Sequence, residues 1–469
     1  MNKRILTVGN VKKTMRYFKK NGIKQAYYAA KERIEEEKRS DYVYTEPKED
    51  VLAAQRADWK RFPYRFSIVV PAYETKKEFL YELIDSVREQ SYERWELIIA
   101  DASAGDAVEE IVTEYQEKKN ERRLRYLRLI ENGGISENTN AGIAEASGDY
   151  IGLLDHDDFL APDALYEMAA AVERAKEEGI RPVLLYSDED KYDNNTCYYK
   201  QPNQKYGFNL DLLLSNNYIC HFMMAESALM KKLKLRKKYD GAQDYDLVLR
   251  IIDHLLTAEA GQDIRKLNEK VLHIPKVLYH WRIHETSTAE NTASKGYAYE
   301  AGKAALEDFL KKRGWDAKVS HSLHLGFYQV DYVPDLLTVR PEVGIVGGRI
   351  LGRQNKMISG IYNEKGERLY QGLHKEYSGG STHRAALMQD CAAVDIRCIR
   401  ICESLQPFFE KITGVSYRET GTQNLADVSE ITCDEAGYRK LSMELGRIAA
   451  KKGYLTVWDP KISVKYAKN

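Results

Sequence analysis

The sequence is short of cysteine pairs, of long apolar runs and of net charge, and each shortage excludes a class of protein. Its six cysteines include no Cys-x-x-Cys pair in 469 residues, so we expect reduced cytoplasmic thiols and no disulfide framework. No stretch approaches the roughly 20 apolar residues of a membrane span, and the charged N-terminus lacks the apolar core of a signal peptide. Lys plus Arg and Asp plus Glu number 71 each, so nothing in the charge predicts a nucleic-acid partner.

Charge is uneven at the start of the chain. Residues 1–31 hold nine Lys or Arg and no Asp or Glu, and apolar residues recur at loosely helical intervals, at Val11, Met15, Phe18, Ile23 and Tyr27. We expect a basic helical leader over residues 1–62. Two interpretations are open: the helix rests on an anionic membrane surface, which would make the protein peripheral on the inner face of the cell membrane, or it packs on the catalytic domain that follows.

A strand that ends in carboxylates is the central feature of the sequence. The apolar run from Tyr150 to Leu154 is typical of a buried parallel strand, and Asp155, Asp157 and Asp158 follow it at once. In an extended chain Asp155 and Asp157 point the same way, roughly 6–7 Å apart, and repel each other unless a cation neutralises them. Mg²⁺ or Mn²⁺ suits these oxygen ligands and bridges phosphates, which indicates a nucleotide-diphosphate site. The alternative is that these acids only cap the next helix.

Strands and helices alternate around this strand. Strands are expected at 66–74, 95–101 and 124–130, with a helix at 79–90, and this order predicts a parallel, doubly wound α/β sheet. Asp101 ends the second strand and could accept the imide N–H of uracil or thymine, while Tyr73 could stack on the base. A strand-end cap and a packed aromatic ring are equally open alternatives.

Four motifs, in order over about 95 residues, resemble the nucleotide half of family 2 glycosyltransferases. They are Ser-Ile-Val-Val-Pro-Ala-Tyr at 67–73, Glu-Leu-Ile-Ile-Ala-Asp at 96–101, Asn-Gly-Gly-Ile-Ser with Asn-Ala-Gly at 132–142, and the acidic strand at 148–158. The resemblance implies a GT-A fold, as in bacterial polysaccharide and O-antigen synthesis, a UDP- or dTDP-linked sugar donor, Mg²⁺ or Mn²⁺, and inversion at the anomeric carbon. It also implies donor-binding roles for Pro71, Tyr73, Glu74, Asp101, Asn140 and Asp155. One departure is Thr139, where many members have an arginine.

The acceptor half continues the resemblance. A strand at 184–190 ends in acids and resembles the segment that closes over the donor sugar, so sugar-binding roles are implied for Asp188, Glu189 and Asp190, with a plain acidic loop as the alternative. Asp244 matches the Asp of the family's Glu-Asp pair at a helix start, which implies the general base, and Gln243 stands in place of the Glu beside the sugar. From the residues alone, Asp244 would be an acid favoured by the helix dipole.

Residues 279–284, Tyr-His-Trp-Arg-Ile-His, resemble the segment under the diphosphate. Arg282 is expected to clamp a phosphate, since its planar guanidinium binds phosphate through two bonds. His284 is expected at the donor, and His280 is expected to complete the metal shell beside Asp155 and Asp157. Which histidine points inward is left open by the sequence.

The remaining chain is unlike a complete enzyme. We expect a catalytic domain at 63–330, a linker at 331–341, and a partial, non-catalytic glycosyltransferase-like domain at 342–469. The last resembles the acceptor half, with strands at 343–351, 394–401 and 455–460 and a helix near 434–451. It could be a scaffold, bind acceptor or form a dimer, and an unrelated cap is the alternative.

The pattern as a whole predicts a metal-dependent, inverting glycosyltransferase that extends a cell-surface polysaccharide or lipid-linked glycan. The main alternative is a non-catalytic nucleotide-sugar or glycan-binding partner, because Thr139 and Gln243 both depart from the family pattern. A nucleotidyltransferase is a minor rival, because residues 71–74 offer no glycine-rich phosphate loop.

Overall fold

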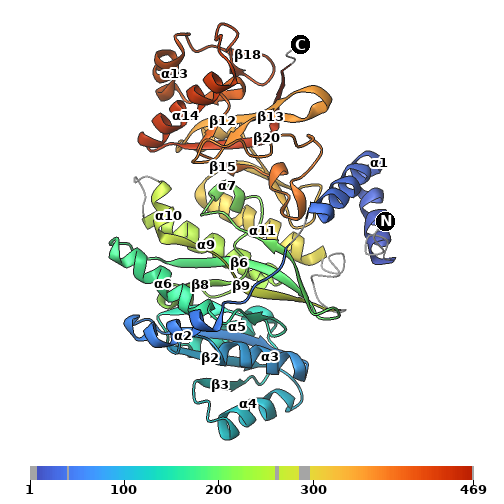
Figure 1. Ribbon diagram of the computed structural model, residues 1–469, viewed down its shortest axis with the longest axis vertical. Helices are drawn as coiled ribbons and strands as arrows, with labels where there is room; N and C mark the ends of the chain where they lie inside the picture. The colour runs from blue at the N-terminus through green and yellow to red at the C-terminus, as the bar shows by residue number, and fades with distance from the viewer. Residues whose placement is uncertain (1–7, 40–41, 259–263, 285–295, 467–469) are drawn as a thin grey trace. The chain divides into compact units, whose positions relative to one another are not determined.

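The computed structural model describes residues 8–39, 42–258, 264–284 and 296–466. The chain forms two compact units (Figure 1). The central unit comprises residues 42–208 and 217–313. The terminal unit comprises residues 1–41, 209–216 and 314–469, so the chain leaves the central unit for eight residues and then returns to it.

The central unit is built on a nine-stranded mixed sheet, in the order β3-β2-β1-β4-β8-β6-β9-β5 with β7 on β6. Its first four strands are parallel, and β8 runs antiparallel to both of its neighbours, β4 and β6. The long strands β6 and β9 are parallel to each other. The bounds are β1 Phe66–Ala72, β2 Trp95–Asp101, β3 Leu124–Arg128, β4 Tyr150–Leu153, β5 Phe159–Leu160, β6 Leu184–Asp193, β7 Tyr198–Asn203, β8 Met223–Glu226 and β9 Val271–Ile283.

Apolar burial explains the core of this sheet. Strand β1 is buried through Ile68, Val69 and Val70, as a strand covered on both faces should be. Helix α5 (Ile135–Glu145) lies against it at Gly142, where an added Cβ would stand 2.5 Å from a Val69 methyl group. The other helices of this unit are α2 Glu49–Asp58, α3 Lys77–Arg88, α4 Ala107–Lys118, α6 Ala164–Glu177, α8 Ser227–Leu233, α9 Gln243–Ala258, α10 Leu267–Lys270 and α11 Gly296–Arg313.

The terminal unit has a five-stranded sheet of its own. Strand β12 (Val343–Leu351) runs parallel to β20 (Leu455–Lys465) and antiparallel to β13 (Met357–Ser359) and β17 (Ile399–Ile401), and β15 (Gln389–Asp390) lies on the far side of β20. Trp458 and Phe409 are fully buried in its core. Its helices are α1 Val8–Arg39, α7 Leu210–Leu213, α12 Leu336–Val339, α13 Gln406–Thr413 and α14 Glu435–Lys451. Short pairs are formed by β10 Ala317–His321 with β11 Tyr328–Tyr332, β14 Ile361–Tyr362 with β16 Ala393–Val394, and β18 Glu419–Thr420 with β19 Leu425–Ala426.

The boundaries of these units differ from those expected at 62 and 330. Helix α2 belongs to the central unit, since the side chain of its Gln55 accepts a hydrogen bond from the Ser91 hydroxyl at 2.6 Å. The β10–β11 hairpin belongs to the terminal unit, where the N–H of Tyr328 donates to the carbonyl of Ser215 at 2.7 Å. Both links join residues far apart in sequence, so local composition could not predict them.

Helix α1 packs within the terminal unit, on the loop of residues 374–383. The Glu32 carboxylate accepts hydrogen bonds from the N–H groups of Ser378, Gly379 and Gly380 at 2.7–3.0 Å. The leader therefore packs on protein, but on a different unit from the one expected. No helix in the described ranges is both long enough and apolar enough to cross a membrane.

Candidate functional site

The carboxyl ends of β1, β2 and β4 carry the residues that the sequence placed at one edge of the sheet. Asp101 ends β2 and is fully buried, where its Oδ1 accepts the N–H of Ser103 and its Oδ2 accepts the Tyr126 hydroxyl, both at 2.9 Å. Tyr73, just beyond β1, is half exposed, so its ring is available to a ligand. Pro71 is partly buried at the end of β1. The exposed Glu74 accepts the N–H of Ala104 at 3.0 Å.

Asp155 and Asp157 follow β4 and both reach solvent, with side chains 44% and 22% exposed. Desolvation by the surrounding protein raises the pKa of Asp155, and the charge of Asp157 raises it further. His221 counteracts this rise, because its Nε2 lies 4.0 Å from Asp155 Oδ2. His284 lies beside Asp157, with Nε2 2.8 Å from Oδ2. The two carboxylates therefore form an acidic pair that two imidazoles approach.

Asp158, the third acid, is an internal support. It is fully buried, and its Oδ1 accepts the N–H of Arg282 at 2.8 Å while its Oδ2 accepts the Tyr279 hydroxyl. Burial raises its pKa, and the charges of Asp157 and Asp155 add to the rise. The helix-cap alternative does not hold for these acids, because α6 begins only at Ala164 and no side chain caps it.

Asp244 is the second residue of α9 and faces two hydrogen-bond donors. The Asn217 amide donates to its Oδ2 at 2.7 Å, and the Cys220 thiol lies 3.7 Å from the same oxygen. Its Oδ1 takes part in neither bond. Asp244 also contributes to the raised pKa of Asp155, so the two carboxylates are electrostatically coupled within the central unit.

Sequence reasoning missed the loop that holds these donors. Residues 217–222 carry Asn217, Cys220 and His221, and the fully buried ammonium of Lys205 donates to the carbonyls of Ile219, at 2.7 Å, and His221. Burial raises the pKa of the Cys220 thiol, and the Asp244 charge adds to this, so the sulfur remains a protonated donor at neutral pH. No sequence motif marks the loop, because its role depends on contacts with residues 14 or more positions away.

The sequence profile described as Glycosyl transferase family 2 matches residues 67–233. This stretch is a family 2 glycosyltransferase domain. The profile covers β1 to α8, which include the acidic pair and the 217–222 loop, whereas Asp244 lies just beyond it.

Two relatives of the chain are larger proteins. It is 37% identical over 250 residues to the uncharacterized protein y4gI of Sinorhizobium fredii, covering 52% of this chain and 25% of that protein. It is 34% identical over 256 residues to the O-antigen biosynthesis protein RfbC of Myxococcus xanthus, covering 54% of this chain and 18% of that protein. The chain thus spans a quarter or less of these relatives. A crystal structure of S. aureus TarS 1-349 in complex with UDP-GlcNAc aligns with 18% identity and a TM-score of 0.40 over 52% of this chain and 66% of that one.

The expected fold class is confirmed: the family 2 domain is part of an α/β unit with a mixed sheet, accompanied by a helical leader and a smaller α/β unit. The structure shows how the predicted site residues are bonded. Arg282, expected to clamp a phosphate, is fully buried, and its guanidinium donates to the Asp157 carbonyl at 2.7 Å and to Asn194 at 2.8 Å. It is also 4.7 Å from the Phe79 ring and 2.5 Å from Glu82. Arg282 therefore supports the turn at 155–158 from inside the protein.

His280 is a core residue in this family 2 domain. It alternates with Tyr279 along β9 and shares a face with Arg282, so both point into the protein. Its Nδ1 is 2.6 Å from Asp190 Oδ1, and the rings of Tyr44, Phe159 and Tyr199 surround it at 4.5–4.9 Å. His280 therefore does not contact the acidic pair. His284, one residue beyond the end of β9, is the histidine beside Asp157.

All three acids at positions 188–190 of β6 are buried. Asp188 accepts the N–H of Lys205 at 2.8 Å and lies 2.7 Å from His273 Nε2, and Asp190 accepts the Tyr42 hydroxyl at 2.7 Å in addition to its contact with His280. Glu189 points to the other face because strand side chains alternate. It accepts the Asn203 amide at 3.0 Å and contributes to the raised pKa of Cys220, so it is the one acid of the three that borders the Asp244 cluster.

The remaining predicted residues have local roles. Both polar atoms of the Asn140 amide bind Leu235: the amide donates to its carbonyl at 2.9 Å and accepts its N–H at 2.8 Å. This pair ties α5 to the loop after α8. Thr139 donates to the Ile135 carbonyl at 2.6 Å inside α5. Gln243 accepts the N–H of Gly241 at 2.8 Å and so closes the turn that begins α9.

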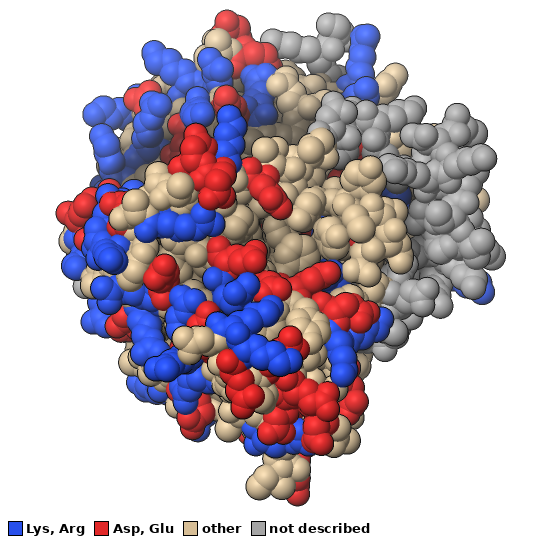
Figure 2. All heavy atoms as spheres, turned by 60° about the horizontal axis from the view of Figure 1, so that its bottom comes forward, with Lys and Arg blue, Asp and Glu red and all other residues tan. Residues whose placement is uncertain are grey.

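A divalent cation would have to be held by Asp155 and Asp157. Among the described residues, no three His, Cys, Asp or Glu side chains converge closely enough to form a ready-made metal site. Two carboxylates on an exposed turn still fit Mg²⁺ or Mn²⁺, which fill the rest of their shell with water and phosphate oxygens. On the face shown in Figure 2, acidic and basic side chains are interspersed, so no broad field of one sign surrounds a site there.

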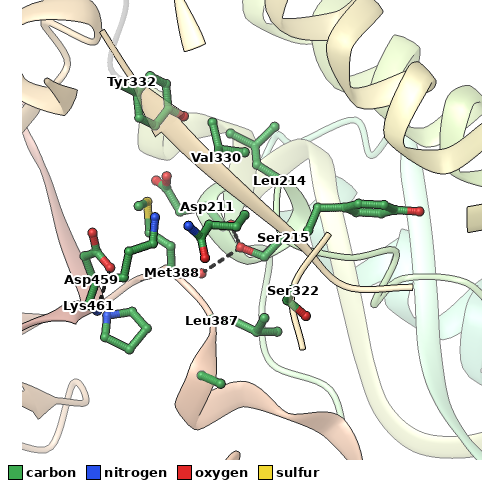
Figure 3. Close-up of a pocket in the computed structure, with 14 residues that line it drawn as sticks. Asp211, Leu214, Ser215, Ser322, Val330, Tyr332, Leu387, Met388, Asp459 and Lys461 are labelled. Carbon is green, nitrogen blue, oxygen red and sulfur yellow. Dashed lines mark hydrogen bonds between the residues drawn. The ribbon is translucent and has the colours of Figure 1, made fainter. Parts of the chain in front are cut away.

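A hollow of about 50 Å³ lies within the terminal unit (Figure 3). Asp211, Leu214 and Ser215 line it together with Tyr332, and the Ser215 hydroxyl donates to the Met388 carbonyl at 3.5 Å. The hollow is several times smaller than the roughly 300 Å³ at which ligand pockets begin. The residues predicted for the site lie in the central unit, and none of them lines this hollow.

Proposed function

We propose that this chain is a metal-dependent, inverting glycosyltransferase that moves a sugar from a nucleotide-diphosphate donor to a hydroxyl of a growing cell-surface polysaccharide or lipid-linked glycan. The observation that carries the proposal is Asp244, whose charge acts on Asp155 of the acidic pair and whose Oδ1 accepts no hydrogen bond among the described residues. The family 2 profile and the relative named for O-antigen biosynthesis support the class of reaction and of product.

On the donor side, Asp155 and Asp157 would hold Mg²⁺ or Mn²⁺, with His284 orienting Asp157 through its 2.8 Å contact. The cation would supply neutralisation of the charge that develops on the leaving diphosphate. Tyr73 offers a half-exposed ring for stacking against a uracil or thymine base. Asp101 is bonded to Ser103 and Tyr126, so its contact with the base requires a further lone pair of the same carboxylate.

On the acceptor side, Asp244 would take the proton of the attacking hydroxyl. Inversion requires a single base opposite the leaving group, within hydrogen-bond reach of the acceptor oxygen. Asn217 and Cys220 both address Oδ2, so they would fix the carboxylate with Oδ1 directed to the acceptor. Glu189, at the edge of the same cluster, is the β6 acid best placed for a sugar hydroxyl.

The alternative is a non-catalytic nucleotide-sugar or glycan-binding partner of a glycan assembly complex. It is favoured by Thr139 and Gln243, which have local roles in place of the residues common in the family. Retention of Asp155, Asp157 and Asp244 favours the enzyme. Slow hydrolysis of the donor in the absence of acceptor would separate the two, because only a catalyst cleaves it.

A thermal-shift screen tests the donor site directly. The protein is heated with a panel of UDP- and dTDP-sugars, in Mn²⁺ or in EDTA, and a ligand of the folded state raises the midpoint by mass action. We expect a Mn²⁺-dependent rise with one nucleotide sugar and its loss in Asp157→Asn. Asp459→Asn, in the terminal unit, is the matched control and should keep the rise. A rise that is equal in EDTA would contradict the metal assignment.

For the whole chain, we propose a catalytic domain at about 63–330 and a non-catalytic glycosyltransferase-like unit toward the C-terminus that serves as scaffold, acceptor-binding module or dimer contact. The activity would take place in the cytoplasm, at the inner face of the cell membrane. A lipid-linked acceptor would be met at that surface.

A further inference from the structure

Helix α1 exposes an apolar stripe made of Ile23, Tyr27 and Ile34. Their side chains are 75%, 60% and 37% exposed. At 100° per residue these three positions fall within about 40° of one another, so they form one line along the helix. The stripe begins directly after Gly22, whose φ of 80° bends the helix. A surface helix ordinarily turns its apolar line toward the core, and this one turns it toward solvent.

The opposite face of the helix fixes this orientation with polar contacts. Gln25 donates to Glu376 at 2.9 Å, Tyr28 stacks on His374 at 4.6 Å, and Glu32 accepts three N–H groups of the 378–380 loop. The acidic and amide side chains therefore pack on protein. Rolling the helix to bury the stripe would break all of these bonds.

Cations flank the stripe. Lys24, Lys31 and Arg33 are exposed, and Lys24 remains 65% exposed even with its ammonium 2.7 Å from Glu376. The acids of the same stretch, Glu32, Glu35 and Glu36, are bonded to residues 377–381, so the described charges that border the stripe are cationic. An apolar line with a cationic border fits a partner that is apolar inside and anionic at its rim.

We propose that the stripe and its flanking cations are a docking surface for an anionic lipid membrane. Ile23, Tyr27 and Ile34 would enter the boundary between headgroups and acyl chains, while the Lys and Arg side chains contact lipid phosphates. A second copy of this chain is a poorer occupant, since it would bring like charges together. This inference rests on the proposed function in one respect only: a lipid-linked acceptor would give the protein a reason to bind a membrane.

Sedimentation with vesicles tests the surface on the full chain. Phosphatidylcholine vesicles, with and without phosphatidylglycerol, are mixed with wild type and with the triple variant Ile23→Ser, Tyr27→Ser, Ile34→Ser. We expect wild type to bind only the anionic vesicles, and the triple variant to bind them roughly tenfold or more weakly, because its apolar insertion is lost. All three side chains are exposed, so the variant should keep the wild-type melting temperature.

The control carries Val43→Ser and Val51→Ser, which remove exposed apolar side chains of the central unit and should leave vesicle binding unchanged. Lys31→Gln with Arg33→Gln should weaken binding a few-fold and reduce its sensitivity to salt. Equal binding by wild type and the triple variant, no preference for anionic lipid, or no vesicle binding at all would each overturn the proposal. Donor hydrolysis is measured without vesicles, so an inactive protein that still binds them would contradict the proposed function and leave this surface standing.

Discussion

The two sheets of this protein repeat one arrangement with different side chains. In the central unit β6 runs parallel to β9 and antiparallel to β8, and in the terminal unit β12 runs parallel to β20 and antiparallel to β17. In both, the register slips along the parallel pair, and a long helix, α9 or α14, comes before its second strand. That residues 342–469 derive from an acceptor half stays a prediction.

The difference lies where function would be. The first turn of α9 presents Asp244 with one oxygen open, whereas the first turn of α14 presents Glu435, whose carboxylate is held by Arg397 at 2.7 Å and Arg368 at 2.8 Å. Strand β6 carries three consecutive acids at 188–190, and the matching stretch of β12 reads Gly347, Gly348 and Arg349. Among the described residues, the same strand arrangement thus presents an acid without an ion pair at the start of α9 and an acid held by two arginines at the start of α14.

The largest effect should come from the acid in each first turn. Asp244→Asn should lower glycosyl transfer by roughly 10²–10⁴-fold, the share of a general base, while leaving the donor-induced thermal shift intact. Glu435→Gln is the matched change in α14 and should leave transfer unaltered, because Glu435 lies in the terminal unit and not in the unit of the proposed base, and Arg397 keeps its pair with Asp395. Steady-state kinetics with both variants checks this, and unchanged turnover in Asp244→Asn would remove the base assignment.

Each unit also has one fully buried arginine, and these should differ in what they support. Arg340 donates to Asp211 at 2.6 Å, so Arg340→Met strands a buried carboxylate and should cost about 3–5 kcal/mol of stability in denaturant unfolding. Arg282→Met should destabilise and also weaken Mn²⁺-dependent donor binding, because it releases the Asp157 carbonyl. If donor binding by the Arg282→Met variant equals that of wild type, the turn at 155–158 keeps its conformation without Arg282.

A smaller effect is expected from the donor beside the base. Asn217→Ala should lower turnover by roughly tenfold and leave the donor-induced thermal shift intact, because Asp244 loses the amide that fixes its Oδ2. The exposed Asn195, on the turn between β6 and β7, provides the control, and Asn195→Ala should change neither. A fall in turnover that is matched by an equal loss of the donor-induced shift would mean that Asn217 supports only the fold of the loop.

The smallest effect concerns pH and the terminal unit. Burial raises the pKa of Asp390, and the nearby Asp211 raises it further. An acid whose pKa is higher in the folded state stabilises the fold below its unfolded pKa of about 3.9 and loses that contribution as pH rises through the folded value. Asp390→Asn should therefore melt a few degrees above wild type at pH 8, with the gap closing toward pH 4. A gap independent of pH would contradict a shifted Asp390.

Much of the fold and part of the site could be predicted from the sequence. The expected strands at 66–74, 95–101 and 150–154 and the helices near 79–90 and 434–451 lie within a residue or two of β1, β2, β4, α3 and α14, because long periodic apolar runs leave one way to bury them. The strand expected at 394–401 is instead broken into β16, a short turn and β17, because Asp395 accepts the N–H of Arg397 and bends the chain.

By itself, the sequence determined the order of strands and helices and put carboxylates at strand ends, since alternation and apolar periodicity are local properties. Only the tertiary structure decided which polar groups are spent internally. The sequence suggested functional roles for four residues that each bind a partner distant in the chain: His280, Arg282, Asp190 and Asn140. Asn217 carried no motif, yet it meets Asp244 because a buried Lys205 holds its loop. Burial and long-range hydrogen bonding depend on how strands pair, and no local pattern contains that information.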